Sequence, residues 1–138
     1  MMQTDIMELR RSKSYSCVIA NHGQIYTFTA RGVDDLYNLL TKQPEILRGA
    51  YVADKIVGKG AAALMVLGGV RRLFTEVISS DAIKFLNDYD MTVEWGEETE
   101  RIINRKGDDI CPIEKACAKC KTPEECFEAI KEFLSKQE

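Results

Sequence analysis

The feature that most constrains the fold is the repeated change of hydrophobic periodicity along the chain. Two strand-like runs, residues 14–20 and 24–29, flank the turn triplet Asn21-His22-Gly23, which predicts an N-terminal antiparallel hairpin. A helical spacing of three or four residues then begins at Val33 and ends before Pro44. Strand-like and helix-like segments alternate through the middle of the chain, which is typical of α/β proteins.

The alternating segments predict a mixed sheet of about five strands. Further strands are expected over residues 49–53, 72–78 and 91–95, and helices over residues 61–67 and 80–87. Crossover helices of this kind cover a mostly parallel sheet, and the hairpin adds an antiparallel portion. The expected order of elements is therefore ββαβαβαβ.

Residues 111–138 predict two closing helices. Pro112 has a favoured first-turn position in the first of them. Thr122 and Glu125 have the spacing of a capping box at the start of the second, which ends at about Leu134. At the other end of the chain, residues 1–12 are expected to form a short helix or a flexible segment.

Length and charge limit the domain organisation and the partners. A chain of 138 residues with 45% hydrophobic residues predicts one domain, residues 1–138, with one core. A net charge of -3 offers no positive field to phosphate backbones or anionic lipid, so neither nucleic acid nor a membrane is expected as a partner. The first residues lack the apolar core of a signal peptide, so a cytoplasmic location is expected.

Several short motifs are distributed over nearly the whole chain, namely Arg31-Gly32-Val33, residues 53–59, residues 76–79, Asn104-Arg105 and residues 111–115. Their order and spacing resemble those of a domain-of-unknown-function family of small proteins with a cytidine-deaminase-like fold. The resemblance implies a three-layer α/β/α sandwich built on a mixed sheet.

The residues that hold zinc in deaminases are missing from this sequence. Zinc-dependent deaminases place His or Cys followed by Glu at the start of one helix, and Pro-Cys-x-x-Cys at the start of the next. The corresponding helices here begin Gly58-Lys59-Gly60-Ala61 and Ser79-Ser80-Asp81-Ala82. Because zinc makes water a nucleophile near neutral pH, zinc-dependent deamination is not expected, and no cofactor is predicted.

The segment from Asp54 to Gly60 is the leading candidate for a ligand site. Glycines such as Gly58 let backbone N–H groups face a ligand at a helix N-terminus, and Lys55 and Lys59 add positive charge. A phosphate or carboxylate fits such a site. The alternative is a strand-to-helix turn whose glycines serve close packing, since the complete phosphate-loop pattern is absent.

Three further residues complete the predicted ligand site. Asn104 and Arg105 belong to a loop, where arginine offers a planar fork to a phosphate or carboxylate, and Glu114 belongs to the last motif. These residues are equally suited to tying loops or capping a helix. The predicted function is binding of a nucleotide-like or other anionic small molecule at the C-terminal ends of the central strands.

Cys111 is the candidate catalytic residue. It precedes Pro112 at a predicted helix start, where free N–H groups favour a thiolate. A non-hydrolytic enzyme or redox protein that uses this thiol is therefore the first alternative function. A small buried residue or a helix cap explains Cys111 equally well, because His22, the only histidine, lies in the hairpin turn.

Four cysteines have the spacing C-x5-C-x2-C-x5-C, namely Cys111, Cys117, Cys120 and Cys126. Four thiolates can hold zinc or an iron–sulfur cluster. The flanking gaps match no common zinc-finger or ferredoxin pattern, which favours ordinary core or surface thiols.

A homodimeric interaction module without any ligand is the second alternative function. The dimer would be built on a sheet edge or on the alanine-rich helix of residues 61–67. The sequence leaves these alternatives open.

Overall fold

The computed structural model describes residues 3–30, 33–104 and 106–136. In these ranges the chain forms α1 Gln3–Ser12, β1 Cys17–Asn21, β2 Gln24–Phe28, α2 Asp34–Lys42, the short 3-10 helix η1 Pro44–Ile46, β3 Tyr51–Val57, α3 Lys59–Gly68, β4 Arg72–Ser79, α4 Ser80–Leu86, β5 Thr92–Thr99, α5 Pro112–Cys117 and α6 Pro123–Ser135. Every helix in these ranges falls short of the length and apolar character that crossing a bilayer requires.

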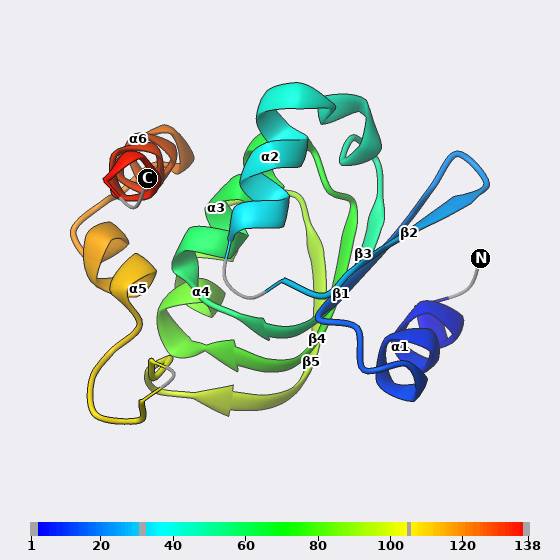
Figure 1. The fold of residues 1–138 in the computed structure, drawn as a ribbon, viewed down its shortest axis with the longest axis horizontal. Coiled ribbons are helices and arrows are strands. Elements are labelled where there is room, and N and C mark those ends of the chain that lie inside the picture. Colours follow the sequence, from blue (N-terminus) through cyan, green and yellow to red (C-terminus); the bar gives the residue numbers. More distant parts are fainter. Residues whose placement is uncertain (1–2, 31–32, 105, 137–138) are drawn as a thin grey trace.

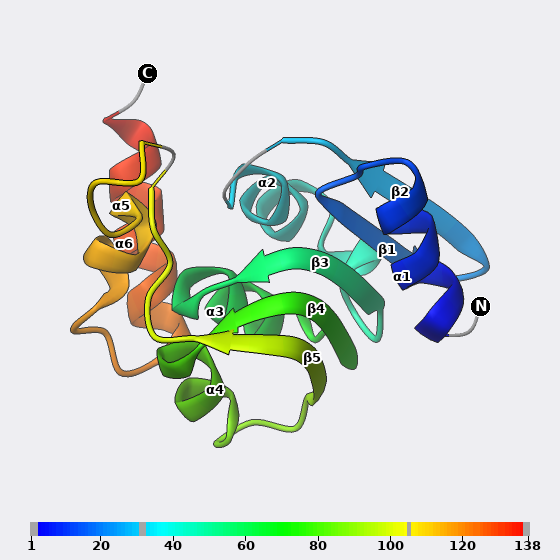
Figure 2. The same cartoon turned by 90° about the horizontal axis from the view of Figure 1, so that it is seen from below.

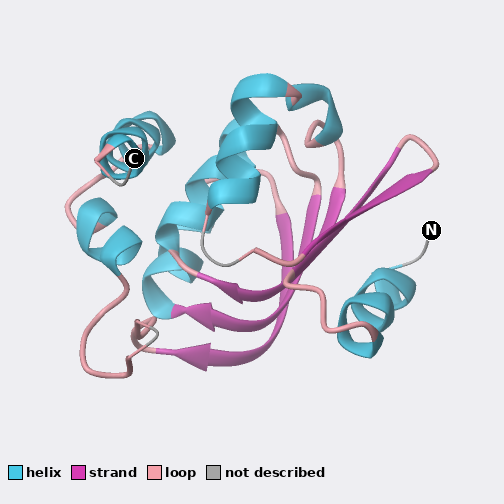
Figure 3. Ribbon diagram, in the orientation of Figure 1, coloured by secondary structure: helices cyan, strands magenta, loops and turns pink. Residues whose placement is uncertain are grey.

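The five strands form one mixed, open sheet in the order β2-β1-β3-β4-β5 (Figure 3). β1 pairs antiparallel with both β2 and β3, whereas β3, β4 and β5 are parallel. α3 connects β3 to β4, and α4 connects β4 to β5, so each parallel pair has a crossover helix. The predicted α/β class, mixed sheet and N-terminal hairpin are therefore confirmed.

Helices cover the two faces of the sheet unequally. α2, α3 and α4 lie along one face, and α1 lies on the opposite face (Figure 1). α5 and α6 pack outside α3, farther from the sheet (Figure 2). The main core lies between the sheet and the helices on the first face, and a smaller core under α1 consists of Ile6, Val18, Ala53 and Phe74.

α3 is the buried centre of the helical layer because its residues are small and apolar. Residues 60–65 are all buried, and α3 packs against α2, α4, α5 and α6. The helix ends at Gly69, whose left-handed φ of 79° matches the glycine stop expected from the sequence. Because α3 is buried within one chain, a homodimer would have to use another surface, such as a sheet edge.

β3 is longer than the sequence predicted. The expected strand covered residues 49–53, whereas β3 runs Tyr51–Val57 and continues the parallel pairing with β4 to its end. Lys55 N also donates to Ser16 O at 3.1 Å, on the side of the hairpin. Pairing on both sides satisfies the extended backbone, so Asp54 and Lys55 are strand residues and do not belong to a loop before α3.

The predicted N-terminal helix and the predicted helix caps are the remaining features to compare with the structure. The first twelve residues contain α1, so the helical alternative holds over their described part. Ser79 Oγ accepts a hydrogen bond from Ala82 N at 3.1 Å and caps α4 as expected. The predicted capping box of Thr122 and Glu125 is present at the start of α6.

β5 forms one edge of the sheet and continues beyond the predicted end at Trp95. Its side chains include the exposed carboxylates Glu94, Glu97 and Glu98. Charge on an edge strand discourages strand addition by another chain. This edge is therefore poorly suited to the sheet-edge homodimer, which stays a prediction.

Candidate functional site

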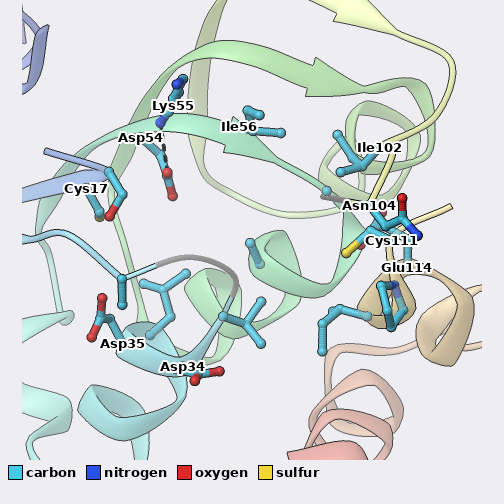
Figure 4. Close-up of a pocket in the computed structure, with 18 of the residues that line it drawn as sticks. Cys17, Asp34, Asp35, Asp54, Lys55, Ile56, Ile102, Asn104, Cys111 and Glu114 are labelled. Atoms are coloured by element: carbon cyan, nitrogen blue, oxygen red, sulfur yellow. Dashed lines mark hydrogen bonds between the residues drawn. The ribbon is translucent and has the colours of Figure 1, made fainter. Parts of the chain in front are cut away.

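A cavity of about 1000 Å³ opens beside the C-terminal half of β3. It lies between β3, the first turn of α2 and the segment that leads from β5 into α5 (Figure 4). Its polar lining consists of Ser16, Cys17, Asp34, Asp35, Asp54, Lys55, Asn104, Lys106, Asp108, Asp109, Cys111 and Glu114. Its large apolar side chains are Ile19, Phe28, Val33, Leu36, Leu39, Ile56, Ile102, Ile103, Ile113 and Phe133. Ligands of α/β proteins commonly bind outside the carboxyl ends of the strands, at the point in the sheet where the strand order reverses.

Asp54 carries a strongly perturbed carboxyl group. Its register partner on β1 is Cys17, and the two side chains lie at one end of the cavity (Figure 4). Asp54 Oδ1 accepts a hydrogen bond from Lys55 N at 2.8 Å. Burial raises the pKa of Asp54 to about 7, although this hydrogen bond and the positive charge of Arg10 act in the opposite direction. A carboxyl group with such a pKa exchanges its proton near neutral pH.

Asp35 and Cys17 complete what we call the acidic end of the cavity, defined as Cys17, Asp35 and Asp54. Burial, and secondly the charge of Asp34, raise the pKa of the Asp35 carboxyl group. Burial also raises the pKa of the Cys17 thiol, and the charges of Asp54 and Asp35 raise it further. The raised pKa disfavours the thiolate, which is the nucleophilic form of Cys17.

The sequence analysis missed Cys17 and Asp35. Cys17 alternates with the buried Ile19 in a strand-like run, and Asp35 belongs to an acidic pair in the first turn of a helix. Neither signal identifies a site, because acidic residues in a first turn ordinarily complement the helix dipole. Only the packing of the hairpin and α2 beside β3 brings these residues to Asp54.

The N-terminus of α3 is closed by a side chain from α5. Glu114 accepts hydrogen bonds from Lys59 N at 2.8 Å and from Gly60 N at 3.2 Å. Lys59 Nζ donates to the carbonyl oxygen of Ala118 at 3.4 Å and to that of Cys120. The donors that the sequence assigned to a bound anion thus have internal acceptors, and an anion would have to displace Glu114.

Gly58 and Gly60 allow α5 to approach α3 this closely. A Cβ on Gly58 would collide with the carboxyl group of Glu114, and a Cβ on Gly60 would lie 2.6 Å from Ile113 Cγ2. Contacts of this length do not fit between packed carbon atoms. Close packing, the alternative interpretation of this glycine-rich segment, accounts for both glycines.

Asn104 shapes the opposite rim of the cavity. Its Oδ1 accepts hydrogen bonds from Gly107 N at 2.9 Å and from Asp108 N at 3.3 Å, and its Nδ2 donates to Asp108 Oδ1 at 2.9 Å. These hydrogen bonds stabilise a turn, so Asn104 has the loop-tying role that the sequence analysis gave as the alternative to ligand binding. Arg105, predicted beside it as a fork for an anion, lies outside the described residues.

The four C-terminal cysteines lie in two places. Cys111 is half-buried in the cavity wall at the start of α5, whereas Cys117 ends the same helix and contacts Cys126 of α6. Cys120 lies in the loop between the two helices. Across residues 3–30, 33–104 and 106–136, no group of three or more His, Cys, Asp or Glu side chains is arranged to hold a metal ion. The four cysteines therefore do not converge on one point.

Most of the predicted site residues, catalytic and ligand-binding together, line this cavity. They are Asp54, Lys55, Gly58, Asn104, Cys111 and Glu114. Lys59 lies behind the wall, where its ammonium group contacts carbonyl oxygens of the α5–α6 connection. Chemically, the acidic end can accept hydrogen bonds or a proton, and Cys111 offers a thiol at the other end. The roles of these residues stay predictions.

Comparison with known proteins gives a family to which no activity is assigned. A family model described as "TM1506: Domain of unknown function (DUF1893)" matches residues 5–134. The crystal structure of a DUF1893 family protein (TM1506) from Thermotoga maritima, at 2.70 Å resolution, is similar with a TM-score of 0.85. The two chains are 26% identical, and the match covers 96% of this chain and 88% of that chain. No curated protein matches.

Proposed function

Because the chain belongs to the DUF1893 family of domains of unknown function, we propose a function from the cavity: binding of a small organic molecule whose hydrogen-bond donors face Asp54 and Asp35. The observation that carries this proposal is a cavity of about 1000 Å³ that contains a carboxyl group with its pKa raised to about 7. Small-molecule sites are typically concave and mostly apolar, with a few polar groups. Strongly perturbed carboxyl groups in such clefts are candidates for function.

The charges of the described cavity residues favour a ligand with donor groups, such as an amine or amidine. Carboxylates outnumber ammonium groups in the lining, where the basic residues are Lys55 and Lys106. Asp109 pairs with Lys115, Glu114 is engaged by α3, and Asp108 accepts a hydrogen bond from Asn104. Asp34 and the two carboxylates of the acidic end therefore remain for a ligand. An anionic or nucleotide-like ligand, which the sequence favoured, would meet this negative charge.

The finer part of the proposal is a cytidine-deaminase-like architecture. The mixed strand order, the parallel strands β3 to β5 and their crossover helices support it. In zinc deaminases, the metal ligands lie at the starts of two neighbouring helices. Here Glu114 closes the start of α3 and Ser79 caps α4, so the proposal keeps the cavity and omits hydrolytic deamination.

A matched fragment screen tests the ligand class. Thermal shift assays compare amines and amidines with carboxylates and phosphates that have the same carbon skeletons. At about pH 8, where Asp54 is mostly ionised, we expect the cationic member of each pair to raise the melting temperature more. Asp54→Asn should remove this difference.

Asp90→Asn is the matched control, because Asp90 is an exposed carboxylate in the turn before β5. It removes the same charge from the whole chain without touching the cavity. Preferential stabilisation by carboxylates or phosphates would overturn the proposed ligand class. If cations raise the melting temperature of the Asp54→Asn variant as much as that of the wild type, they bind at a site other than Asp54.

A thiol enzyme that uses Cys111 is the second candidate function. It is favoured by one observation: the half-buried Cys111 side chain lines the cavity and makes no capping hydrogen bond. Alkylation of Cys111 at a series of pH values tests it. A reaction midpoint well below the ordinary thiol value of about 8.5 supports an activated nucleophile, and a midpoint near that value argues against one.

A further inference from the structure

The cavity contains exposed apolar side chains to which the proposed function assigns no role. Large apolar side chains of the described residues are exposed at four positions, namely Ile25, Ile56, Trp95 and Ile103. Ile56 and Ile103, which are 45% and 52% exposed, line the cavity, and the half-buried Ile102 lines it too. We call Ile56, Ile102 and Ile103 the apolar rim. Single exposed apolar residues are ordinary, whereas several in one concave site indicate a binding surface.

Paired backbone holds the apolar rim in place. Cys111 N donates to Ile102 O at 2.8 Å, and Ile103 forms an antiparallel β-bridge with Ile110. Ile56 belongs to β3, where it is paired with β4. The exposure of these side chains is therefore a property of the folded chain. A site that is already formed binds a ligand without the entropic cost of ordering a loop.

The acidic end and the apolar rim lie apart in the same cavity. In Figure 4, Asp54 lies towards one end, Ile102 lies towards the other, and Ile56 lies between them. Asp54 and Ile56 are two positions apart on β3, which corresponds to about 7 Å along the strand. A ligand whose donor group contacts Asp54 therefore needs an extension of several carbon atoms to cover the apolar rim.

The charges beside the apolar rim disfavour a second cationic group on the ligand. Lys106 lines the cavity in the loop that follows Ile103. Two carboxylates of this loop already have partners, because Asp108 accepts a hydrogen bond from Asn104 at 2.9 Å and Asp109 pairs with Lys115. An ammonium group placed here would lose water without gaining an unpaired carboxylate. A hydrocarbon group would instead cover apolar surface that is exposed to water.

We propose that the ligand is an amphipathic monocation, with one ammonium or amidinium group at the acidic end and a hydrocarbon chain or ring over the apolar rim. This inference rests on the proposed function and narrows its ligand class to amines and amidines that carry an apolar tail. Diamines and polyamines are poor ligands, because their second charge meets the apolar rim and Lys106. Full burial of each added methylene group tightens binding by about fourfold.

Calorimetric titration of the folded chain with n-alkylamines, from ethylamine to octylamine, at about pH 8 tests the proposal. We expect affinity to increase with chain length, by up to about fourfold per methylene group, and hexamethylenediamine to bind more weakly than hexylamine. Asp54→Asn should weaken binding of the whole series by a similar factor and keep the dependence on length. Ile103→Ser should leave ethylamine unchanged and weaken binding of the longer amines.

Ile25→Ser is the matched control, because Ile25 is an exposed isoleucine on β2 that does not line the cavity. It should bind the whole series like the wild type. Ile56→Thr is a second rim variant that keeps a β-branched residue on β3, and it should also reduce the dependence on length.

Three results would overturn this inference and leave the proposed function standing. Short amines bind but longer ones bind no more tightly, hexamethylenediamine binds as tightly as hexylamine, or Ile103→Ser keeps the wild-type dependence on chain length. If no amine of any length binds, the inference and the proposed function are both wrong.

Discussion

The Asp54 carboxyl group is held in the cavity by the backbone on either side of it. Asp54 is a β3 residue paired with Cys17 on one strand and with Thr75 on the other. This pairing fixes the backbone of Asp54 beside the cavity, so only side-chain rotation can move the carboxyl group. Desolvation therefore acts on the charged form and raises the pKa from 3.8 to about 7. In the unfolded chain that restraint is absent.

Asp54→Asn is expected to change how stability depends on pH. The native pKa exceeds the unfolded one, so the stability contributed by protonated Asp54 is fully present below about pH 4 and is lost as pH rises through about 7. The loss amounts to at most about 4 kcal/mol. The variant lacks this loss and should gain stability relative to the wild type between about pH 5 and pH 8. Urea unfolding at both pH values measures the gain.

Asp90→Asn should leave the wild-type pH dependence unchanged, because the exposed Asp90 lies outside the cavity. If Asp54→Asn shows the same fall in stability as the wild type over this interval, the Asp54 carboxyl group is not desolvated in the native state.

Glu114→Ala is expected to expose the N-terminus of α3. The N–H groups of Lys59 and Gly60 lose their acceptor, which should cost about 1–2 kcal/mol. Inorganic phosphate should recover part of that stability in the variant, because a vacant helix N-terminus binds anions. Glu128→Ala, an exposed change on α6, controls for lost charge.

The effect of phosphate on the wild type shows whether the N-terminus of α3 is occupied by Glu114 or is free to bind an anion. If Glu114 occupies this position in solution, phosphate stabilises the variant and leaves the wild type unchanged. Equal stabilisation of both chains would instead mean that the wild type offers a free anion site, as the sequence suggested. Unfolding midpoints with and without phosphate provide the measurement.

Among the elements, α3 and α5 depend on each other most directly. α3 lacks a capping side chain of its own at Gly58, and α5 supplies one from Glu114. α5 is only six residues long, so its position depends on this contact and on Ile113 packed against Gly60. The wall of the cavity that carries Cys111 therefore requires glycine on α3.

Gly60→Ala is expected to destabilise the chain by about 1–3 kcal/mol, because its Cβ would overlap Ile113. The same substitution should cost less in an Ile113→Ala background, where the overlapping methyl group is gone. A double-mutant cycle measured by urea unfolding gives the coupling between the two sites. Equal costs in both backgrounds would show that α5 does not pack on Gly60.

Much of the element order could be predicted because its signals are local. The hairpin turn at Gly23, the stop at Gly69 and the capping box at Thr122 each depend on a few adjacent residues. The C-terminal end of β3 could not be predicted in this way. Asp54-Lys55 looks like a polar loop until its pairing partners on the neighbouring strands are known. The capping of α3 by Glu114 joins residues more than fifty positions apart and has no local signal.

In the whole molecule, the cavity arises where the antiparallel hairpin meets the parallel part of the sheet. The hairpin, β3 and α2 provide the acidic end, and the segment after β5 provides the opposite rim with Asn104 and Cys111 (Figure 4). The sequence predicted the residues of the rim and Asp54 from short motifs. It did not predict the acidic end as a unit, because Cys17, Asp35 and Asp54 belong to three elements that only the tertiary fold brings together.

The central claim is that Asp54 belongs to a cavity that receives hydrogen-bond donors. Carbon-13 NMR of the Asp54 carboxyl group, titrated from about pH 4 to pH 9 with and without benzamidine, tests it most directly. The account predicts titration near the value of about 7 in the free protein and a lower pKa when the cation is bound. Titration near the ordinary value, with no change on adding benzamidine, would contradict the account.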